Sequence, residues 1–217
     1  MEEMALEFID VSTKGKKFSL QNVSFSLPKG YVMGLSGRNG AGKTTLLKLI
    51  VEEGAKYSGK IKIFGKELKE ERSLMNQIAW ICEDVTWLLE RNAVKNATLL
   101  GVFYETFDMQ KFLDKMQEFG VSVRQNVGTY SKGEFVKFQL AFGIAHGAKL
   151  FLLDEATAGM DVVFRREFWK QIGKWIAQEE ITVVAATHIE QELELKTDYI
   201  GIMEEGRMIS YGENAAV

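Results

Sequence analysis

The residues with the clearest chemical meaning lie in one short run that matches the pattern G-x-x-x-x-G-K-[ST]. Glycines in such a run let backbone N–H groups approach a polyphosphate without a Cβ in the way. Lys43 would reach the β- and γ-phosphates of a nucleotide, and the Thr44 hydroxyl would be a ligand of the accompanying Mg²⁺. The alternative is a glycine-rich turn before an ordinary helix, but such a turn would tolerate many other residues. The predicted nucleotide-binding residues of this run are Gly37, Arg38, Asn39, Gly40, Ala41, Gly42, Lys43, Thr44 and Thr45.

The flanking sequence has the strand–loop–helix order that this loop needs. An apolar run from Tyr31 to Leu35 predicts a buried strand, which breaks at Ser36-Gly37. Helix-forming residues begin at Lys43, and apolar side chains then recur on one helical face. The positive N-terminal end of that helix would point at the bound phosphates.

A second candidate group follows another apolar run, the four residues 150–153. This run predicts a buried strand that brings Asp154 and Glu155 to its C-terminal end, where ligands bind in open α/β sheets. Asp154 would hold Mg²⁺ through its water shell, and Glu155 would polarise the water that attacks the γ-phosphate. Taken alone, two acidic residues after a strand are also typical of a helix cap.

Strand and helix patterns predict an α/β fold. Residues 5–11 and 23–27 are strand-like, and together they indicate an antiparallel patch. Helical spacing replaces the strand pattern from about residue 91 to residue 147, which indicates a helical insert. Further strands alternate with a helix of about 18 residues from Asp161, which indicates a mainly parallel, covered sheet. The predicted core contacts of the insert are Phe103, Phe107, Phe112, Met116 and Phe119. The other predicted strands are 59–64, at a sheet edge, 77–82, 149–154, 181–186 and 199–203.

The composition is that of an ordinary globular chain. Of 217 residues, 46% are hydrophobic, and no apolar run reaches the roughly 20 residues that span a bilayer. The formal net charge of −3 disfavours general electrostatic binding to nucleic acid. The first residues are acidic and lack the charge pattern of a signal peptide. The single cysteine, Cys82, excludes an intrachain disulfide and fits a reducing cytoplasm.

A third motif makes the pattern specific. Tyr130-Ser131-Lys132-Gly133-Glu134 opens a predicted helix just before the strand that carries Asp154. A phosphate-binding loop, a helical insert, an S-x-G signature, an acidic strand end and a later strand ending in Thr187-His188 follow one another in this order. This order resembles the nucleotide-binding domain of ABC (ATP-binding cassette) proteins over essentially the whole chain. The run Tyr-Ser-Lys-Gly, followed later by Ala145-His146, is similar to the ATPase subunits of bacterial drug and antibiotic-resistance exporters.

The resemblance implies a P-loop NTPase core with a mainly parallel sheet, an N-terminal antiparallel β patch and an inserted helical subdomain. Residues 1–83 and 148–217 would form the catalytic core of this single domain, and residues 84–147 would form the helical subdomain. ATP and Mg²⁺ are the implied cofactors. The implied catalytic residues are Glu155, His188 and Lys43.

The resemblance also implies that each ATP is bound between two cassettes. Ser131, Lys132 and Gly133 match the signature, which contacts the γ-phosphate of ATP on the opposite subunit. Asp161 matches the D-loop at the seam of that dimer, and His188 matches the switch histidine that contacts the γ-phosphate. Two sites would form when two domains, identical or different, pack head to tail.

Several positions depart from the family pattern, among them Lys132 in place of the second signature glycine, and two departures bear on the nucleotide site. The family usually has Gln after the strand that precedes the helical insert, and this chain has Glu83 there. An ionised carboxylate only accepts hydrogen bonds, whereas an amide also donates them; we expect Glu83 to contact Mg²⁺ or its water. The family often stacks adenine on a tyrosine, but Lys14 stands at that position. Phe18 is the nearest aromatic residue that could stack on adenine. A role for Phe18 in the core of a strand is an equal alternative.

These features predict the ATP-hydrolysing subunit of a membrane transporter, with export favoured. The alternatives are a non-transport ABC ATPase acting on a ribosome or nucleic-acid complex, and another P-loop enzyme such as a kinase. The predicted partners are a second ABC ATPase subunit and a transmembrane permease, without direct contact to nucleic acid. The chain would therefore be cytoplasmic, at the inner face of the cell membrane. A short permease helix would dock beside residues 83–89, where Trp87, Leu88 and Leu89 either line the groove or belong to the core.

Overall fold

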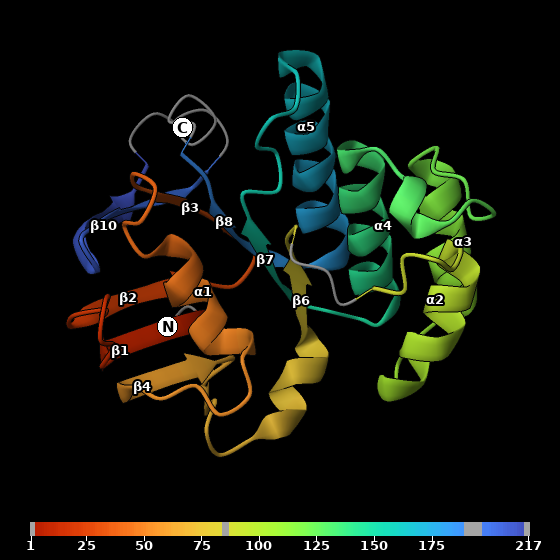
Figure 1. Ribbon diagram of the computed structural model, residues 1–217. Coiled ribbons are helices and arrows are strands. Elements are labelled where there is room, and N and C mark those ends of the chain that lie inside the picture. Colours follow the sequence, from red (N-terminus) through yellow and green to blue (C-terminus); the bar gives the residue numbers. More distant parts are fainter. Residues whose placement is uncertain (1–2, 84–86, 189–196, 215–217) are drawn as a thin grey trace.

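Two β-sheets and two groups of helices make up the fold (Figure 1). The computed structural model describes residues 3–83, 87–188 and 197–214. The smaller sheet is antiparallel and has the strand order β2-β1-β4-β5. Its strands are β1 (Met4–Ser12), β2 (Val23–Pro28), β4 (Ser58–Ile63) and β5 (Lys66–Glu67). The predicted antiparallel patch is confirmed, but β4 lies one strand inside the sheet edge because the short β5 pairs with it.

The larger sheet has the order β10-β9-β3-β8-β7-β6. Its pairs are parallel except for β10, which pairs antiparallel with β9. Its strands are β3 (Val32–Ser36), β6 (Ile78–Ile81), β7 (Leu150–Asp154), β8 (Thr182–Ala186), β9 (Tyr199–Glu204) and β10 (Arg207–Glu213). The predicted mainly parallel, covered sheet is confirmed.

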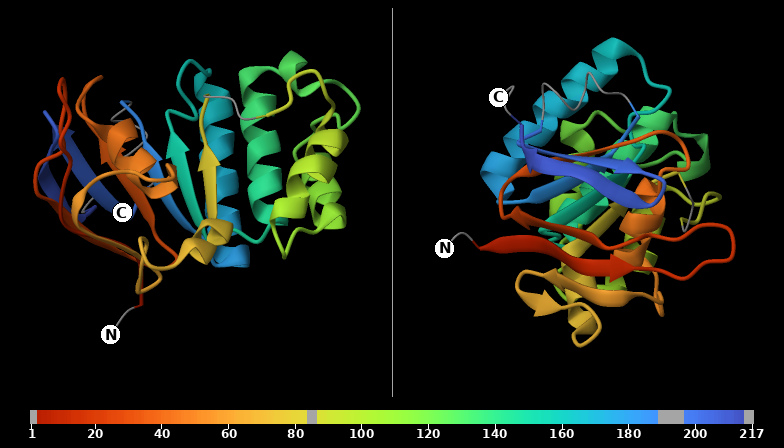
Figure 2. Two further views of the ribbon diagram at one scale, coloured as in Figure 1. Left: turned by 60° about the horizontal axis from the view of Figure 1, so that its bottom comes forward. Right: turned by 90° about the vertical axis from the view of Figure 1, so that its left-hand side faces the viewer.

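Alternation along β7 shows how the larger sheet separates two cores. Leu150 and Leu152 face the layer that contains α1 (Lys43–Val51), together with apolar residues of the smaller sheet. Phe151 and Leu153 face the opposite layer. Because successive side chains of a strand point to opposite faces, a strand buried on both faces is apolar throughout, as this one is. The helix that follows the phosphate-binding loop is therefore packed between the two sheets (Figure 2).

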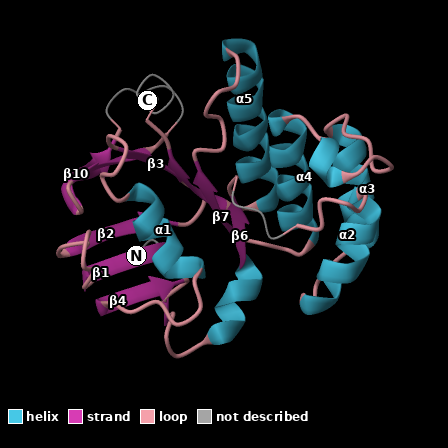
Figure 3. Cartoon of the chain, in the orientation of Figure 1, coloured by secondary structure: helices cyan, strands magenta, loops and turns pink. Residues whose placement is uncertain are grey.

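The other long helices lie on the far side of the larger sheet (Figure 3). α4 and α5 pack on its β6–β8 part, and α2 and α3 lie outside α4 (Figure 1). The four helices are α2 (Ala93–Leu100), α3 (Met109–Glu118), α4 (Lys132–Ala145) and α5 (Val162–Glu179). Three 3₁₀ turns, η1 (Arg72–Gln77), η2 (Gly101–Phe103) and η3 (Val127–Thr129), connect elements.

The predicted core of the helical insert is confirmed at Phe112, Met116 and Phe119, which are buried. The prediction that Phe103 is a core residue is wrong, because its side chain is 74% exposed. Close packing at Gly101 explains the difference. A Cβ on Gly101 would lie 2.6 Å from the Phe107 ring, so the half-buried Phe107 covers the start of η2 while Phe103 remains at the surface.

A buried histidine ends α4. His146 Nδ1 donates to the Asn76 carbonyl at 3.2 Å, since a carbonyl oxygen only accepts. The imidazole stacks on Tyr104 with ring centroids 4.1 Å apart. Burial lowers the pKa of His146 to about 4, although hydrogen bonds to backbone partners act in the opposite direction. The folded chain therefore holds a neutral imidazole between η1 and the helical insert.

We expect His146 to make the fold sensitive to acid. Its pKa is near 6.5 in the unfolded chain and about 4 in the folded chain, so the unfolded state binds more protons between these values. The stability contribution is complete above about pH 6.5 and is lost as the pH falls towards 4, by roughly 3 kcal/mol. In denaturant titrations at pH 7, 6, 5 and 4, His146→Gln should lose less stability than the original chain.

The matched control is His188→Gln, which leaves His146 in place and should keep the acid-sensitive step. Parallel stability curves for the original chain and His146→Gln would contradict a role for this imidazole.

Candidate active site

The loop between β3 and α1 depends on its glycines, since Gly37, Gly40 and Gly42 all have positive φ. Gly37 and Gly42 have φ values of 151° and 110°. A Cβ on Gly37 would lie 2.5 Å from the Met203 carbonyl oxygen, and one on Gly42 would lie 2.7 Å from the Phe18 ring. Gly42 is also the N-cap of α1 and provides no side-chain cap. The first backbone N–H groups of α1 are thus left to meet an anion.

Lys43 holds a buried ammonium beneath this loop. The residue is 5% exposed. Its Nζ donates to the Gly37 carbonyl at 2.7 Å and to the Arg38 carbonyl at 3.4 Å. The same Nζ lies 3.4 Å from Glu155 Oε1. These contacts place a positive charge between the loop and the end of β7.

Thr44 and Asp154 meet across the same site. The Thr44 hydroxyl donates to Asp154 Oδ1 at 2.9 Å. Burial raises the pKa of Asp154 above its usual range, and the hydrogen bond from Thr44 partly opposes that shift. A hydroxyl and a carboxylate are hard oxygen ligands of the kind that Mg²⁺ prefers, and a bound cation would favour the ionised form of this half-buried carboxylate. Within the described residues, no group of three or more His, Cys, Asp or Glu side chains could hold a metal.

Glu155 follows at a special backbone position. Its φ is 51°, a left-handed conformation that residues other than glycine seldom adopt and that is common at functional sites. Its N–H donates to the Ala186 carbonyl at 2.9 Å, which fixes the residue to the end of β8. Its Oε2 lies 2.8 Å from His188 Nδ1. The carboxylate is thus held between the Lys43 ammonium and the His188 ring.

A cavity of about 520 Å³ opens over these groups. Its lining joins the phosphate-binding loop, the start of α1 and the ends of β7 and β8: Phe18, Asn39, Gly40, Gly42, Lys43, Thr44, Thr45, Glu155, Ala158 and His188. Gly37, Arg38 and Ala41 line a neighbouring cavity that also reaches His188. Phe18 is half-buried, and its ring faces the cavity beside Gly42. The site therefore combines N–H groups that can bind phosphate, oxygen ligands for a cation, a carboxylate and an aromatic ring.

The chain matches a family of known proteins over most of this architecture. The family model for ABC transporters matches residues 20–158. The lantibiotic transport ATP-binding protein SrtF of Streptococcus pyogenes is 32% identical over 199 residues, which cover 90% of this chain and 84% of SrtF. The chain belongs to the ABC transporter ATP-binding family. It is accordingly an ATP-binding domain of a family that hydrolyses ATP.

Other similar proteins agree with this assignment. The bacitracin transport ATP-binding protein BcrA of Bacillus licheniformis is 28% identical over 203 residues, which cover 90% of this chain and 65% of BcrA. The structure of cbiO1 from Clostridium perfringens, part of the ABC transporter complex cbiONQ, has a TM-score of 0.84 at 22% identity, covering 98% of this chain and 90% of cbiO1. This likeness confirms the predicted fold class. No helix in the described residues has the length and apolar character needed to cross a membrane.

The residues that the resemblance assigns to the signature and the D-loop lie outside the cavity that contains Lys43. Ser131 caps α4 and forms a reciprocal capping box with Glu134. A Cβ on Gly133 would lie 2.6 Å from the Phe164 ring, so glycine lets α4 approach α5 closely. Asp161 caps α5 by accepting from the Phe164 N–H at 2.8 Å. Ser131, Gly133 and Asp161 are all absent from the described residues that line this cavity.

The structure brings Glu83 to Lys132 rather than to Thr44 and Asp154. The carboxylate of Glu83 forms an ion pair with the Lys132 ammonium. Glu83 is absent from the described residues that line the Lys43 cavity. The sequence analysis missed Gln139, which hydrogen-bonds to the backbone of Cys82, next to Glu83. A polar residue within the apolar run of α4 was the available signal.

We expect Lys43→Ala to weaken ATP binding. Loss of a hydrogen bond from a charged donor costs roughly 1.5–3 kcal/mol, or about 10- to 150-fold in Kd. Equilibrium titration with a fluorescent ATP analogue measures the change. Lys48→Ala is the control, because it removes a positive charge from the same helix outside the cavity. Equal affinity of the Lys43→Ala variant and the original chain would exclude direct phosphate contact.

Proposed function

We propose that this chain is the ATPase subunit of a membrane exporter and that Glu155 is its catalytic carboxylate. The position of Glu155 carries the proposal. The residue is fixed to β8 through its backbone, and its two carboxylate oxygens contact His188 and Lys43. A carboxylate so placed at the edge of this cavity can polarise a water for attack on the γ-phosphate.

The neighbouring residues divide the remaining tasks. Lys43 and the N–H groups at the start of α1 bind the phosphates, and His188 orients Glu155 and contacts the γ-phosphate. Thr44 and Asp154 would hold Mg²⁺, which would neutralise phosphate charge when it is bound. Phe18 offers an aromatic face to adenine beside Gly42.

The signature supports a two-subunit site. Ser131 and Gly133 lie at the N-terminus of α4, outside the chain's own nucleotide cavity. A helix N-terminus is suited to an anion, and the anion would be the ATP bound to a second cassette. Two chains would then pack head to tail, with Asp161 of each near the seam. ATP would be enclosed between them and hydrolysed there.

Glu155→Gln should nearly abolish hydrolysis while leaving ATP binding intact, because the amide cannot accept a proton. The expected fall in turnover is roughly 10²- to 10⁴-fold. Light scattering should show a mass near that of a monomer without ATP and near that of a dimer with Mg-ATP. The control is Glu70→Gln, which neutralises an exposed carboxylate on the smaller sheet side.

Two outcomes would count against these assignments. Near-normal turnover of Glu155→Gln would remove Glu155 from the catalytic role. A mass that never changes with Mg-ATP would reject pairing between identical chains.

The names of similar proteins support the exporter part of the proposal. SrtF is a lantibiotic transport protein, BcrA is a bacitracin transport protein, and LnrL of Bacillus subtilis is a linearmycin resistance protein, 28% identical over 204 residues. These three proteins act on antibiotic-like compounds. We infer that this chain energises movement of such a compound through a separate permease.

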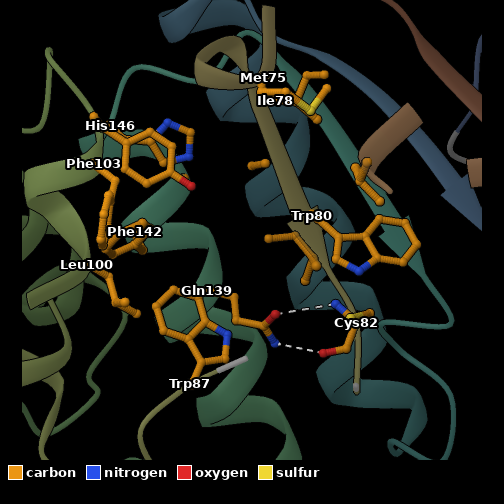
Figure 4. Close-up of a pocket in the computed structure, with 15 residues that line it drawn as sticks. Met75, Ile78, Trp80, Cys82, Trp87, Leu100, Phe103, Gln139, Phe142 and His146 are labelled. Atoms are coloured by element: carbon orange, nitrogen blue, oxygen red, sulfur yellow. Dashed lines mark hydrogen bonds between the residues drawn. The ribbon is translucent and has the colours of Figure 1, made fainter. Parts of the chain in front are cut away.

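A pocket of about 390 Å³ between β6 and the helical insert offers a place for that permease (Figure 4). Its lining is mainly apolar and includes Trp80, Leu100, Phe103 and Phe142. Trp87 also lines the pocket, but its ring packs edge-on against Phe138 and Phe142, with ring centroids 4.6 and 5.0 Å apart. Trp87 therefore serves both the core and the pocket, and Trp87→Ala would destabilise the fold.

Leu88 and Leu89 are exposed beside this region. Residues 84–86, which the sequence analysis assigned to the same groove, lie outside the described residues. An apolar face of a short permease helix would fit a pocket of this lining.

Two neighbouring residues allow a clean test of docking. Phe103 and Val102 are 74% and 76% exposed, but only Phe103 lines the pocket. Phe103→Ser should reduce co-purification with the permease several-fold, because exposed aromatic residues often dominate interface energies. Val102→Ser should have little effect, and both variants should keep their thermal stability. Equal retention of the permease by the two variants would move the docking site elsewhere.

A further inference from the structure

The end of β6 is fastened to one face of α4 by two consecutive residues. The Cys82 N–H donates to Gln139 Oε1 at 3.3 Å, and Gln139 Nε2 donates to the Cys82 carbonyl at 3.1 Å (Figure 4). The next residue, Glu83, pairs with Lys132. Lys132 and Gln139 are seven positions apart and so lie on the same face of a helix. Both links therefore join the same strand end to the same helix face.

The two elements also approach closely further along. A Cβ on Gly143 would lie 2.7 Å from the Ala79 Cβ. Lys132, Gln139 and Gly143 thus give α4 three points of attachment to the β6 segment. A shift of the strand end would have to be transmitted to the helix that carries the signature.

Lys132 itself stands at an electrostatically unfavourable position. It is the first residue of α4, where the helix dipole presents its positive end. Its Nζ also lies 3.9 Å from the position that a Cβ of Gly159 would occupy, in the loop before Asp161. The Glu83 carboxylate faces this ammonium. A negative charge there offsets both the lysine and the helix end, which a neutral glutamine would not do.

We propose that Glu83 is a positioning residue that orients Lys132 and the signature at the N-terminus of α4, and not a metal ligand. The inference rests on the proposed two-subunit site, since it is the signature of one chain that would meet the ATP of the other. Glu83, through Lys132, then sets the angle at which Ser131 and Gly133 are presented. Gln139 meanwhile holds the end of β6 against α4 through its two hydrogen bonds to Cys82.

A neutral double-mutant cycle tests the pairing in the full chain. The variants are Glu83→Gln, Lys132→Gln and the double substitution, each assayed for ATP hydrolysis. The side chains of Lys132 and Glu83 are 35% and 64% exposed, so solvent screens the pair and its coupling should be about 1.4- to fivefold in kcat. Glu83→Gln should lower kcat with little change in KM, and the double substitution should recover part of the loss.

Two further readouts separate positioning from metal binding or from general loss of structure. High salt should reduce kcat of the original chain towards that of Glu83→Gln and should affect that variant less. The Mg²⁺ concentration at half-maximal activity should be the same for both. A raised Mg²⁺ requirement in Glu83→Gln without recovery in the double substitution would establish a metal ligand instead. Strictly multiplicative effects of the two single substitutions would show that the ion pair has no role.

The result can be told apart from failure of the two-subunit proposal. The Glu155→Gln chain could fail to dimerise when Mg-ATP is added while the double-mutant cycle still shows coupling. The head-to-tail site would then be wrong, and Glu83 would act within one chain. If pairing occurs and the cycle shows no coupling, the two-subunit site stands and the role of Glu83 is rejected.

Discussion

The buried ammonium of Lys43 is the constraint on which the site depends. A buried charge is costly unless hydrogen bonds and an opposite charge surround it. The acceptors here are two carbonyls of the loop and the Glu155 carboxylate. The loop can fold back over Nζ because Gly37 and Gly42 adopt conformations and close approaches that a Cβ would prevent. The shape of the loop and the left-handed turn at Glu155 therefore both serve one positive charge, the charge that a polyphosphate would meet.

Much of this arrangement could be predicted because short-range patterns determine it. The apolar runs before Ser36 and Asp154 gave β3 and β7, and parallel strands present their carboxyl ends at one sheet edge. Asp161 was recognised as the start of an 18-residue helix, and it caps α5. The loop motif fixed Lys43 and Thr44 by residue type alone. Features that depend on residues close together in the chain could therefore be predicted from the sequence.

The features that sequence reasoning did not predict depend on which side chains meet in the folded chain. Phe103 was assigned to the core from helical spacing, but Gly101 admits Phe107 closely and leaves Phe103 outside. The resemblance led us to expect Glu83 near Mg²⁺; its ion pair with Lys132 depends on how α4 packs on β6, which the sequence pattern does not record. Gln139 was missed for the same reason. A sequence pattern indicates which face of a helix is buried, but it does not identify the atoms that each side chain contacts.

The polar side chains at the end of β6 match their partners by chemistry. Pairing of β6 with β7 ends at Ile81, and the backbone of Cys82 still needs a donor and an acceptor. Gln139 has both in one amide and so takes the place of a neighbouring strand. Lys132 needs only acceptors, and Glu83 has only acceptors when it is ionised. An amide at 83 would remove the charge that faces the Lys132 ammonium, and a carboxylate at 139 could not donate to the Cys82 carbonyl. The departure from the family pattern at Glu83 is therefore consistent with a lysine in the signature.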